Sequence, residues 1–152
     1  MTDIDIGPIR AATAEDVQAI MALLAQLSSR ADSFSQADLQ AILANPSTTI
    51  FAARADGAVI GMTTVVVFRV ATGMRAFIDD VVVMETYRKR RLGEELVRAA
   101  INHAASLGVE KIDLTSRPSR EAANRLYQRM GFERRHTNVY RLRLPNNADS
   151  LA

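Results

Sequence analysis

The sequence predicts an α/β fold of the α+β kind, in which a central, mostly antiparallel twisted sheet carries helices on both faces. Apolar segments with the spacing of strands alternate with segments that have the spacing of helices. The pairs Asp56-Gly57 and Thr72-Gly73 are turn signals between three consecutive strands, which indicates antiparallel neighbours. The strand from Arg75 to Val83 leads instead into a long helix, as in a crossover connection. The expected order is β-α-α-β-β-β-α-β-α-β-β.

In the first third of the chain, the pattern predicts one strand and two helices. Ile4 to Arg10 alternates weakly and is expected to be a strand. Thr13 is a helix cap in a Thr-x-x-Asp pattern that resembles a capping box. A second, short helix runs from Ser35 to Leu43, and Asn45-Pro46 ends it. The first helix has apolar residues at helical spacing, namely Val17, Ile20, Met21, Leu24 and Leu27.

The middle of the chain predicts a meander of three strands. These strands are Thr48 to Arg54, Val59 to Val70 and Arg75 to Val83. The long helix that follows ends at Gly108, because glycine readily takes the backbone conformation that closes a helix. Its apolar stripe consists of Leu92, Leu96, Ala100, Ile101, Ala104 and Leu107.

The last part of the chain predicts three strands and a helix. Lys111 to Thr115 is a short strand, and the helix from Ser119 to Met130 ends at Gly131. Phe132 to His136 and Val139 to Leu144 are expected to form a closing pair of strands. Residues 1–144 are therefore assigned to a single domain and residues 145–152 to a polar tail.

Composition narrows the classes of function. The chain has 152 residues and no cysteine, which excludes disulfides, thiolate metal sites and a cysteine nucleophile. Its formal net charge of +2 is weak evidence for nucleic-acid binding. His103 and His136 have no partner at metal-ligand spacing, so no metal is expected. No apolar segment is long enough to span a membrane, and the N-terminal residues do not resemble a signal peptide, so a cytoplasmic location is expected.

The segment between the third strand of the meander and the long helix has the character of a phosphate-binding site. Arg88, Lys89, Arg90 and Arg91 form a cationic turn just before the helix, and Gly93 follows. The first turn of a helix presents unpaired backbone N–H groups at the positive end of the helix dipole. A phosphorylated ligand is therefore expected at this helix N-terminus. Read without that context, the four cations also fit a solvated surface or a nucleic-acid patch.

Two motifs together resemble the GNAT superfamily of acetyl-CoA-dependent N-acetyltransferases. The family pattern Arg/Gln-x-x-Gly-x-Gly/Ala corresponds to Arg88 through Gly93, with Arg91 at the position of the central glycine. The family's Leu-Tyr-x-x-x-Gly-Phe ending corresponds to Leu126 through Phe132 without a mismatch. The resemblance covers the second half of the chain by motif and the first half by element order. It implies the GNAT fold and acetyl-CoA or CoA as co-substrate.

The resemblance also implies which residues contact that co-substrate. The strand before the loop splays from its neighbour, and its free backbone groups at Val81, Val82 and Val83 pair with the pantetheine amides. One of these N–H groups would polarise the thioester carbonyl. The pyrophosphate would lie against the loop and the first helical turn, which comprise Arg88, Lys89, Arg90, Arg91, Leu92, Gly93 and Glu94.

The last predicted helix supplies further candidates. Arg120, Asn124 and Tyr127 are spaced to share one helix face. The family often has asparagine at the position of Arg120. In this chain, Arg120 is assigned to a CoA phosphate, and Asn124 is assigned to the pantetheine. Tyr127 resembles the residue that protonates the departing CoA thiolate, and a phenol with a pKa of about 10 suits that role. Taken alone, Tyr127 would be a core aromatic residue.

A base for the attacking amine is expected at Asp79-Asp80, two carboxylates that interrupt an apolar strand. Adjacent strand residues point to opposite faces, so both can line one cleft only if a bulge intervenes. Asp80 is preferred because it shares parity with Val82. The alternative role for either aspartate is to cap a turn or to pair with Arg75.

The resulting hypothesis is direct transfer of an acetyl group from acetyl-CoA to a primary amine in a ternary complex. The acceptor is expected to be a small molecule or a peptide, with no nucleic-acid or membrane partner, and a homodimer is possible. One alternative is a catalytically weak acyl-CoA-binding sensor or partner-binding module. A second is a nucleic-acid-binding protein that uses the basic loop.

Overall fold

The computed structural model describes residues 2–28 and 33–145. The chain divides into two compact units, Met1–Arg117 and Pro118–Ala152, which are described separately. Whether residues 1–144 form a single domain stays a prediction. The predicted polar tail lies, apart from Pro145, outside the described residues.

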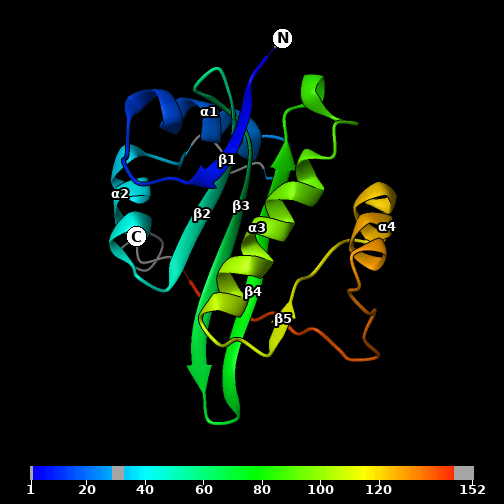
Figure 1. The fold of residues 1–152 in the computed structure, drawn as a ribbon. Coiled ribbons are helices and arrows are strands. Elements are labelled where there is room, and N and C mark those ends of the chain that lie inside the picture. The colour runs from blue at the N-terminus through cyan, green and yellow to red at the C-terminus, as the bar shows by residue number, and fades with distance from the viewer. Residues whose placement is uncertain (1, 29–32, 146–152) are drawn as a thin grey trace. The chain divides into compact units, whose positions relative to one another are not determined.

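The first unit is built on a five-stranded sheet with the order β1-β2-β3-β4-β5 (Figure 1). The first three pairings are antiparallel and the last is parallel, which confirms the predicted mixed, mostly antiparallel sheet. The strands are β1 (Ile4–Pro8), β2 (Thr48–Ala55), β3 (Ala58–Val70), β4 (Gly73–Val83) and β5 (Lys111–Asp113).

The hairpin between β2 and β3 has the predicted two-residue turn. Asp56 and Gly57 have positive φ values of 49° and 87°, the backbone that a tight turn with the twist of the strands requires. Ala55 and Ala58 are paired on either side of it. The turn therefore fixes the pairing of the residues next to it, and the register shifts between Ala53 and Arg54.

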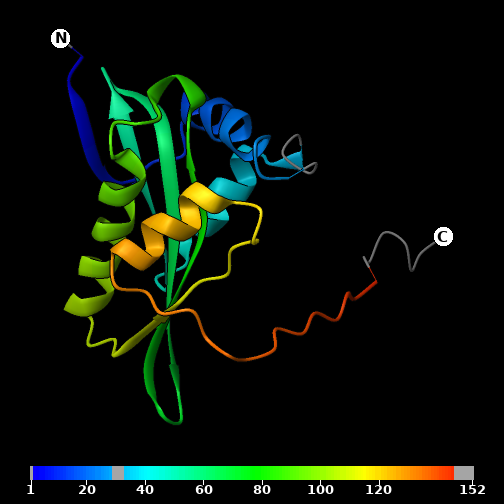
Figure 2. The same ribbon diagram turned by 90° about the vertical axis from the view of Figure 1, so that its right-hand side faces the viewer.

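Helices cover both faces of the sheet, as predicted. On one face lie α1 (Ala14–Leu24) and α2 (Gln36–Ala44), and on the other lies α3 (Leu92–Ser106), as the edge-on view of Figure 2 shows. The core between the sheet and the first two helices includes Val17, Ile20, Leu23, Leu39, Ile50, Met62 and Val82. The core under α3 includes Ala53, Ala55, Ile60, Leu92 and Leu96.

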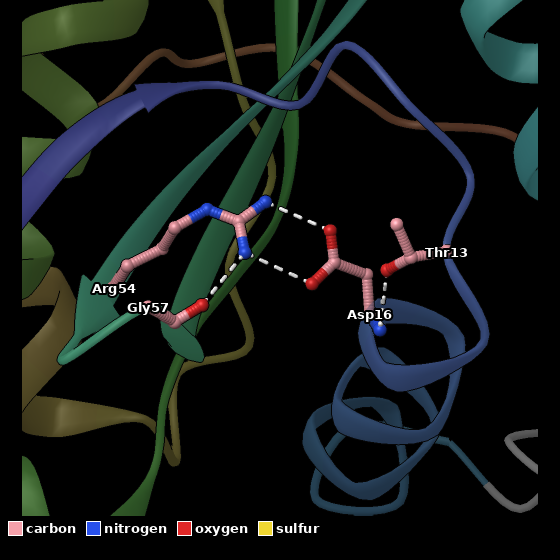
Figure 3. A network of polar contacts seen from close by, with 4 residues as sticks. All are labelled: Thr13, Asp16, Arg54 and Gly57. Carbon is pink, nitrogen blue, oxygen red and sulfur yellow. Dashed lines mark hydrogen bonds and ion pairs between the residues drawn. The ribbon is translucent and has the colours of Figure 1, made fainter.

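The N-termini of α1 and α2 are both capped by side chains. The Thr13 hydroxyl accepts the backbone N–H of Asp16, as predicted, but the Asp16 carboxylate binds Arg54 (Figure 3). The predicted capping box at this helix is therefore only half formed. A full capping box occurs at α2, where Ser35 and Asp38 exchange hydrogen bonds.

In the second unit, α4 (Glu121–Arg129) begins two residues after the predicted Ser119 and ends one residue before the predicted Met130. Gly131, with a φ of 100°, follows the C-cap residue Met130. The predicted closing strands, Phe132 to His136 and Val139 to Leu144, are wrong, because no residue from 132 to 145 is in a strand. Tyr140 and Leu142 are 86% and 85% exposed. Alternating apolar residues favour an extended chain, but a strand also needs a partner, and no other described segment pairs with this one.

No helix within residues 2–28 and 33–145 is both long enough and apolar enough to cross a membrane.

Candidate functional site

A β-bulge in β4 interrupts the sheet at the predicted pair of aspartates. Thr64 pairs with Asp79 and Met62 pairs with Val82, so two residues of β4 lie opposite one residue of β3. Asp80 is the first of these two residues and has a φ of 53°. A bulge that begins with a left-handed residue usually has glycine there, and aspartate is among the few other residues that tolerate this conformation. An intervening bulge is the condition for both aspartates to line one cleft, and this bulge is present.

This bulge makes the argument from strand parity wrong. Met62 and Thr64 are two residues apart on β3, so they face the same side of the sheet. Their partners Val82 and Asp79 must face that side as well. Because the bulge adds a residue, Asp79 rather than Asp80 shares a face with Val82.

Hydrogen bonds around the bulge give the two aspartates different environments. The Asp79 carboxylate accepts the backbone N–H of Asp80 at 2.9 Å, and the hydroxyl of the fully buried Thr63 donates to the Asp79 carbonyl at 3.3 Å. Asp79 therefore stabilises the bulge. Thr63 was not predicted, and its only signal was a polar residue within an apolar strand.

The Asp80 carboxyl has a raised pKa. The residue is exposed overall, but protein atoms packed around the carboxyl group limit its hydration and raise its pKa, and the charge of Asp79 raises it further. A carboxylate with a raised pKa is a stronger base than an ordinary one. The local environment therefore favours Asp80 over Asp79 as a proton acceptor.

Strands β4 and β5 separate beside this bulge. Their parallel pairing ends at Phe77 and Asp113, while β4 continues to Val83. Along Ile78–Val83, no described strand lies on the side of β4 opposite to β3. Backbone groups at such an edge can pair with an extended ligand that has amide groups. Val81, Val82 and Val83, predicted for that role, lie along this open edge.

The cationic loop has a left-handed backbone at two positions. After the short 3₁₀ helix at Glu85–Tyr87, Lys89 and Arg91 have φ values of 67° and 59°. Arg91 therefore adopts the backbone of the glycine that it replaces in the family pattern. For a residue with a Cβ atom this conformation costs roughly 1 kcal/mol.

Arg91 is the N-cap residue of α3, and no side chain caps this helix. The hydroxyls of Thr13 and Ser35, by contrast, cap α1 and α2. The backbone N–H of Glu95 donates to the Arg91 carbonyl at 3.1 Å and begins the helical ladder. The N–H groups of Leu92, Gly93 and Glu94 precede that bond, so they are available to an anion.

Two of the four cations in the loop contact neighbouring side chains. Arg88 Nη2 donates to Gln26 Oε1 at 2.7 Å. The guanidinium of Arg90 lies over the Tyr87 ring, 5.2 Å from its centre, as a cation–π contact. These contacts hold the two guanidinium groups against Gln26 and Tyr87. Gln26 was not predicted.

The second unit contains the other predicted site residues. Asn124 and Tyr127 are both within α4, so the spacing that brings them to one face is retained. Arg120 is instead the N-cap residue, outside the first helical turn, and its carbonyl accepts the Asn124 N–H at 3.0 Å. Tyr127 is buried, with its ring edge-on to Phe132 at a centroid distance of 5.9 Å.

Metal-binding side chains do not cluster in the described part of the chain: no group of three His, Cys, Asp or Glu residues is suitably placed there.

Comparison with known proteins identifies the family. The model of the acetyltransferase (GNAT) family matches residues 17–132. The aminoglycoside N-acetyltransferase AAC(6')-Iy, solved with CoA, superposes with a TM-score of 0.78 and 22% identity, over 95% of this chain and 97% of that one. A Trypanosoma brucei acetyltransferase gives a TM-score of 0.76 and 24% identity, over 93% and 100% of the two chains.

Glucosamine-6-phosphate N-acetyltransferase from Arabidopsis thaliana gives a TM-score of 0.76 and 18% identity, over 92% and 98% of the two chains. At these identities the structural similarity shows the fold alone. Comparison with curated protein sequences gives no significant match. The family model spans most of the chain. The protein with this sheet, this separated β4 and this uncapped α3 therefore belongs to the acetyltransferase (GNAT) family.

Proposed function

We propose that this protein transfers an acetyl group from acetyl-CoA to a primary amine. The observation that carries the proposal is the continuous path from the open edge of β4, through the cationic loop, to the uncapped N-terminus of α3. This path offers backbone hydrogen bonds to an amide-containing arm and positive charge to a pyrophosphate. The CoA in the AAC(6')-Iy complex supports the same ligand here.

On this proposal, the residues of the first unit hold acetyl-CoA in two parts. Val81–Val83 bind the pantetheine arm through their backbone groups. The N–H groups of Leu92, Gly93 and Glu94 bind the pyrophosphate, and the cations of Arg88–Arg91 neutralise its charge. Arg120 and Asn124 contribute from the second unit, to phosphate and pantetheine respectively.

The chemistry proposed is direct transfer in a ternary complex. Asp80 accepts a proton from the substrate ammonium, either directly or through water, because only the neutral amine is a nucleophile. The amine nitrogen forms a bond to the acyl carbon as the carbon–sulfur bond breaks. A backbone N–H of Val81–Val83 stabilises the charge on the thioester oxygen. Tyr127 donates its phenolic proton to the CoA thiolate, and the products are an amide and CoA.

A small cationic amine is the proposed acceptor. Asp79 and Asp80 place two carboxylates on one exposed stretch of β4, which attracts a substrate ammonium. Two proteins of the same fold support this class: one aminoglycoside acetyltransferase is solved with sisomicin, and AAC(6')-Iy with a CoA–acetylneamine bisubstrate analogue. A peptide amine, a homodimer and a cytoplasmic location stay predictions.

The first test is isothermal titration with acetyl-CoA and with CoA, for the native protein and for Arg91→Gly. We expect micromolar binding of both ligands by the native protein. Weaker binding by Arg91→Gly would identify Arg91 as a phosphate ligand, and stronger binding would mean that its backbone opposes the ligand. If neither ligand binds the native protein, the proposal is wrong.

Turnover is tested separately by following CoA thiol release with a panel of amines. The chain has no cysteine, so a thiol reagent reacts with CoA alone. Amine-dependent release supports the transferase. Tight acetyl-CoA binding without release across the panel would favour the second candidate, an acyl-CoA sensor, for which the departure from glycine at Arg91 is the motivating observation.

A further inference from the structure

Thr63 is a buried polar residue in an apolar part of β3. Its side chain is fully buried, and the apolar residues Val65, Val66 and Val67 follow closely in the same strand. Valine has nearly the same shape as threonine and would fill the same space without a hydroxyl. The burial of a hydroxyl is unfavourable unless it forms a hydrogen bond. Packing therefore does not explain threonine at this position.

The Thr63 hydroxyl contacts the peptide group at which the bulge begins. It donates to the Asp79 carbonyl oxygen at 3.3 Å. The N–H of the same peptide group belongs to Asp80 and donates to the Asp79 carboxylate at 2.9 Å. Because a peptide group is planar, its C=O and N–H turn together. Side chains from β3 and β4 therefore hold both polar groups of the Asp79–Asp80 peptide.

The orientation of this peptide determines the backbone conformation of Asp80. Asp80 has a φ of 53°, which is unfavourable for a residue with a Cβ atom and persists only where the surroundings hold it. A flip of the Asp79–Asp80 peptide would return Asp80 to the negative φ of an ordinary strand residue. The same flip would turn the Asp79 carbonyl away from the Thr63 hydroxyl. The hydrogen bond from Thr63 therefore opposes the flip.

We propose that Thr63 is a positioning residue for the base Asp80. By holding the Asp79–Asp80 peptide, its hydroxyl keeps the Asp80 carboxyl at the place where it accepts the proton of the substrate ammonium. The inference rests on the function proposed above. Because its side chain is fully buried, Thr63 acts through Asp80 and touches neither the amine nor CoA.

The first experiment measures the pKa of the Asp80 carboxyl by carbon-13 NMR titration without ligand, and Asp80→Asn identifies its signal. Protein atoms packed around this carboxyl and the charge of Asp79 raise its pKa above 3.8. A carboxyl that leaves this place becomes better hydrated, so its pKa should be lower in Thr63→Val and in Thr63→Ala than in the native protein. Thr63→Ser keeps the hydroxyl and should retain the native value. An unchanged pKa in both Thr63→Val and Thr63→Ala overturns the inference.

The second experiment is a double-mutant cycle on the rate of thiol release. Thr63→Val alone should lower kcat for an amine about twofold to tenfold, which corresponds to the loss of one neutral hydrogen bond, and should keep the affinity for acetyl-CoA. In the Asp80→Asn background the same change should cost no further activity, because the base through which Thr63 acts is absent. A residue that only supports the fold would lower the activity equally in both backgrounds.

Thr64→Val is the matched control for both experiments. It makes the same change at the next residue of β3, whose side chain faces the other side of the sheet, so it should change neither the pKa of Asp80 nor kcat. Native activity in Thr63→Val, or equal losses in the two backgrounds, overturns the inference and leaves the proposed function intact. Absence of thiol release by the native protein with every amine overturns both.

Discussion

Asp16 and Arg54 form a two-point ion pair that joins α1 to β2 (Figure 3). The two guanidinium nitrogens lie 2.9 and 2.8 Å from the two carboxylate oxygens, and Arg54 also donates to the Gly57 carbonyl at 3.0 Å. Asp16 is buried, and its hydrogen bonds raise the pKa of Arg54. The contact connects the first helix to the hairpin turn between β2 and β3.

Removal of this pair should destabilise the fold. Asp16→Asn leaves the half-buried Arg54 without its counter-charge, so we expect a loss of about 2 kcal/mol in the free energy of unfolding, measured by urea denaturation. Arg98→Ala is the control, because it removes a surface pair in which Arg98 lies 3.9 Å from Glu94 and is 59% exposed. That change should cost less than about 0.5 kcal/mol. Equal effects would show that burial of the pair has no importance.

Arg91→Gly should make the protein more stable. Glycine relieves the left-handed strain at this position, although its greater freedom in the unfolded chain offsets part of the gain. We expect an increase of about 0.5 kcal/mol in the free energy of unfolding, measured without ligand. Arg90→Gly is the matched control, because Arg90 does not have a positive φ and stacks on Tyr87, so the same change there should be destabilising. If Arg91→Gly is less stable than the native protein, the left-handed backbone at Arg91 is not a source of strain.

Asp80→Asn should separate activity from stability. Because the folded protein raises the pKa of Asp80 above 3.8, it binds the proton more tightly than the unfolded chain does. Stability therefore falls as pH rises from 3.8 through the raised pKa, and this loss persists at neutral pH. Asparagine cannot ionise and tolerates the left-handed backbone. The unfolding midpoint of Asp80→Asn at pH 7 should equal or exceed that of the native protein. This variant should also not show the loss of stability that Asp80 causes as the pH rises.

The same variant should lose activity if Asp80 is the base. A general base contributes about 10²- to 10⁴-fold, so we expect kcat/KM for an amine to fall within that range while acetyl-CoA affinity is kept. Asp79→Asn is the comparison, since the Asp79 carboxylate supports the bulge by accepting the Asp80 N–H. A larger loss of activity in Asp79→Asn than in Asp80→Asn, with both proteins folded, would transfer the role to Asp79.

Gly61 allows α3 to pack closely on the sheet beneath the site. A Cβ atom there would lie 3.2 Å from Leu96 Cδ1 and 3.3 Å from the Val82 carbonyl oxygen. Gly61→Ala should therefore lower the free energy of unfolding by about 1–2 kcal/mol in urea. Gly7→Ala in β1 is the control, because a Cβ atom there meets nothing within 4 Å. A neutral Gly61→Ala would show that Leu96 moves aside without cost.

Local sequence patterns predicted most of the elements and the face that each buries. The turn at Asp56-Gly57 and the helical spacing in α1 and α3 are set by residues close to one another in the sequence. Such features can therefore be predicted from the sequence alone. The bulge at Asp80 was only partly predictable. An aspartate in an apolar strand is a visible signal, but the extra residue is defined by the register against β3, which is a property of two strands.

The errors have the same origin. The predicted capping box assigned Asp16 a partner three residues away, whereas its partner Arg54 is on another strand. The predicted last strands have the right alternation but no paired segment among the described residues. Long-range pairing, which periodicity does not encode, was the missing information in both cases.

Tyr127→Phe tests the proposed acid. Loss of the phenol removes the proton for the CoA thiolate but keeps the ring, which lies edge-on to Phe132 at 5.9 Å. We expect thiol release to slow by about 10²-fold or more, while titration shows CoA binding within a few-fold of native. Tyr140→Phe is the control, because Tyr140 is 86% exposed and its loss of a hydroxyl should change neither quantity.

The dependence of Tyr127→Phe on the leaving thiol of the acyl donor gives the sharper result. If the phenol protonates the thiolate, acyl donors whose leaving thiol has a lower pKa need less protonation, so the variant's deficit should shrink as the thiol pKa of the donor falls. A tyrosine that only supports packing would give the same deficit with every donor and a lower unfolding midpoint. Near-native thiol release in Tyr127→Phe, with a weak and a strong leaving group alike, would remove Tyr127 from the reaction and leave proton delivery to water.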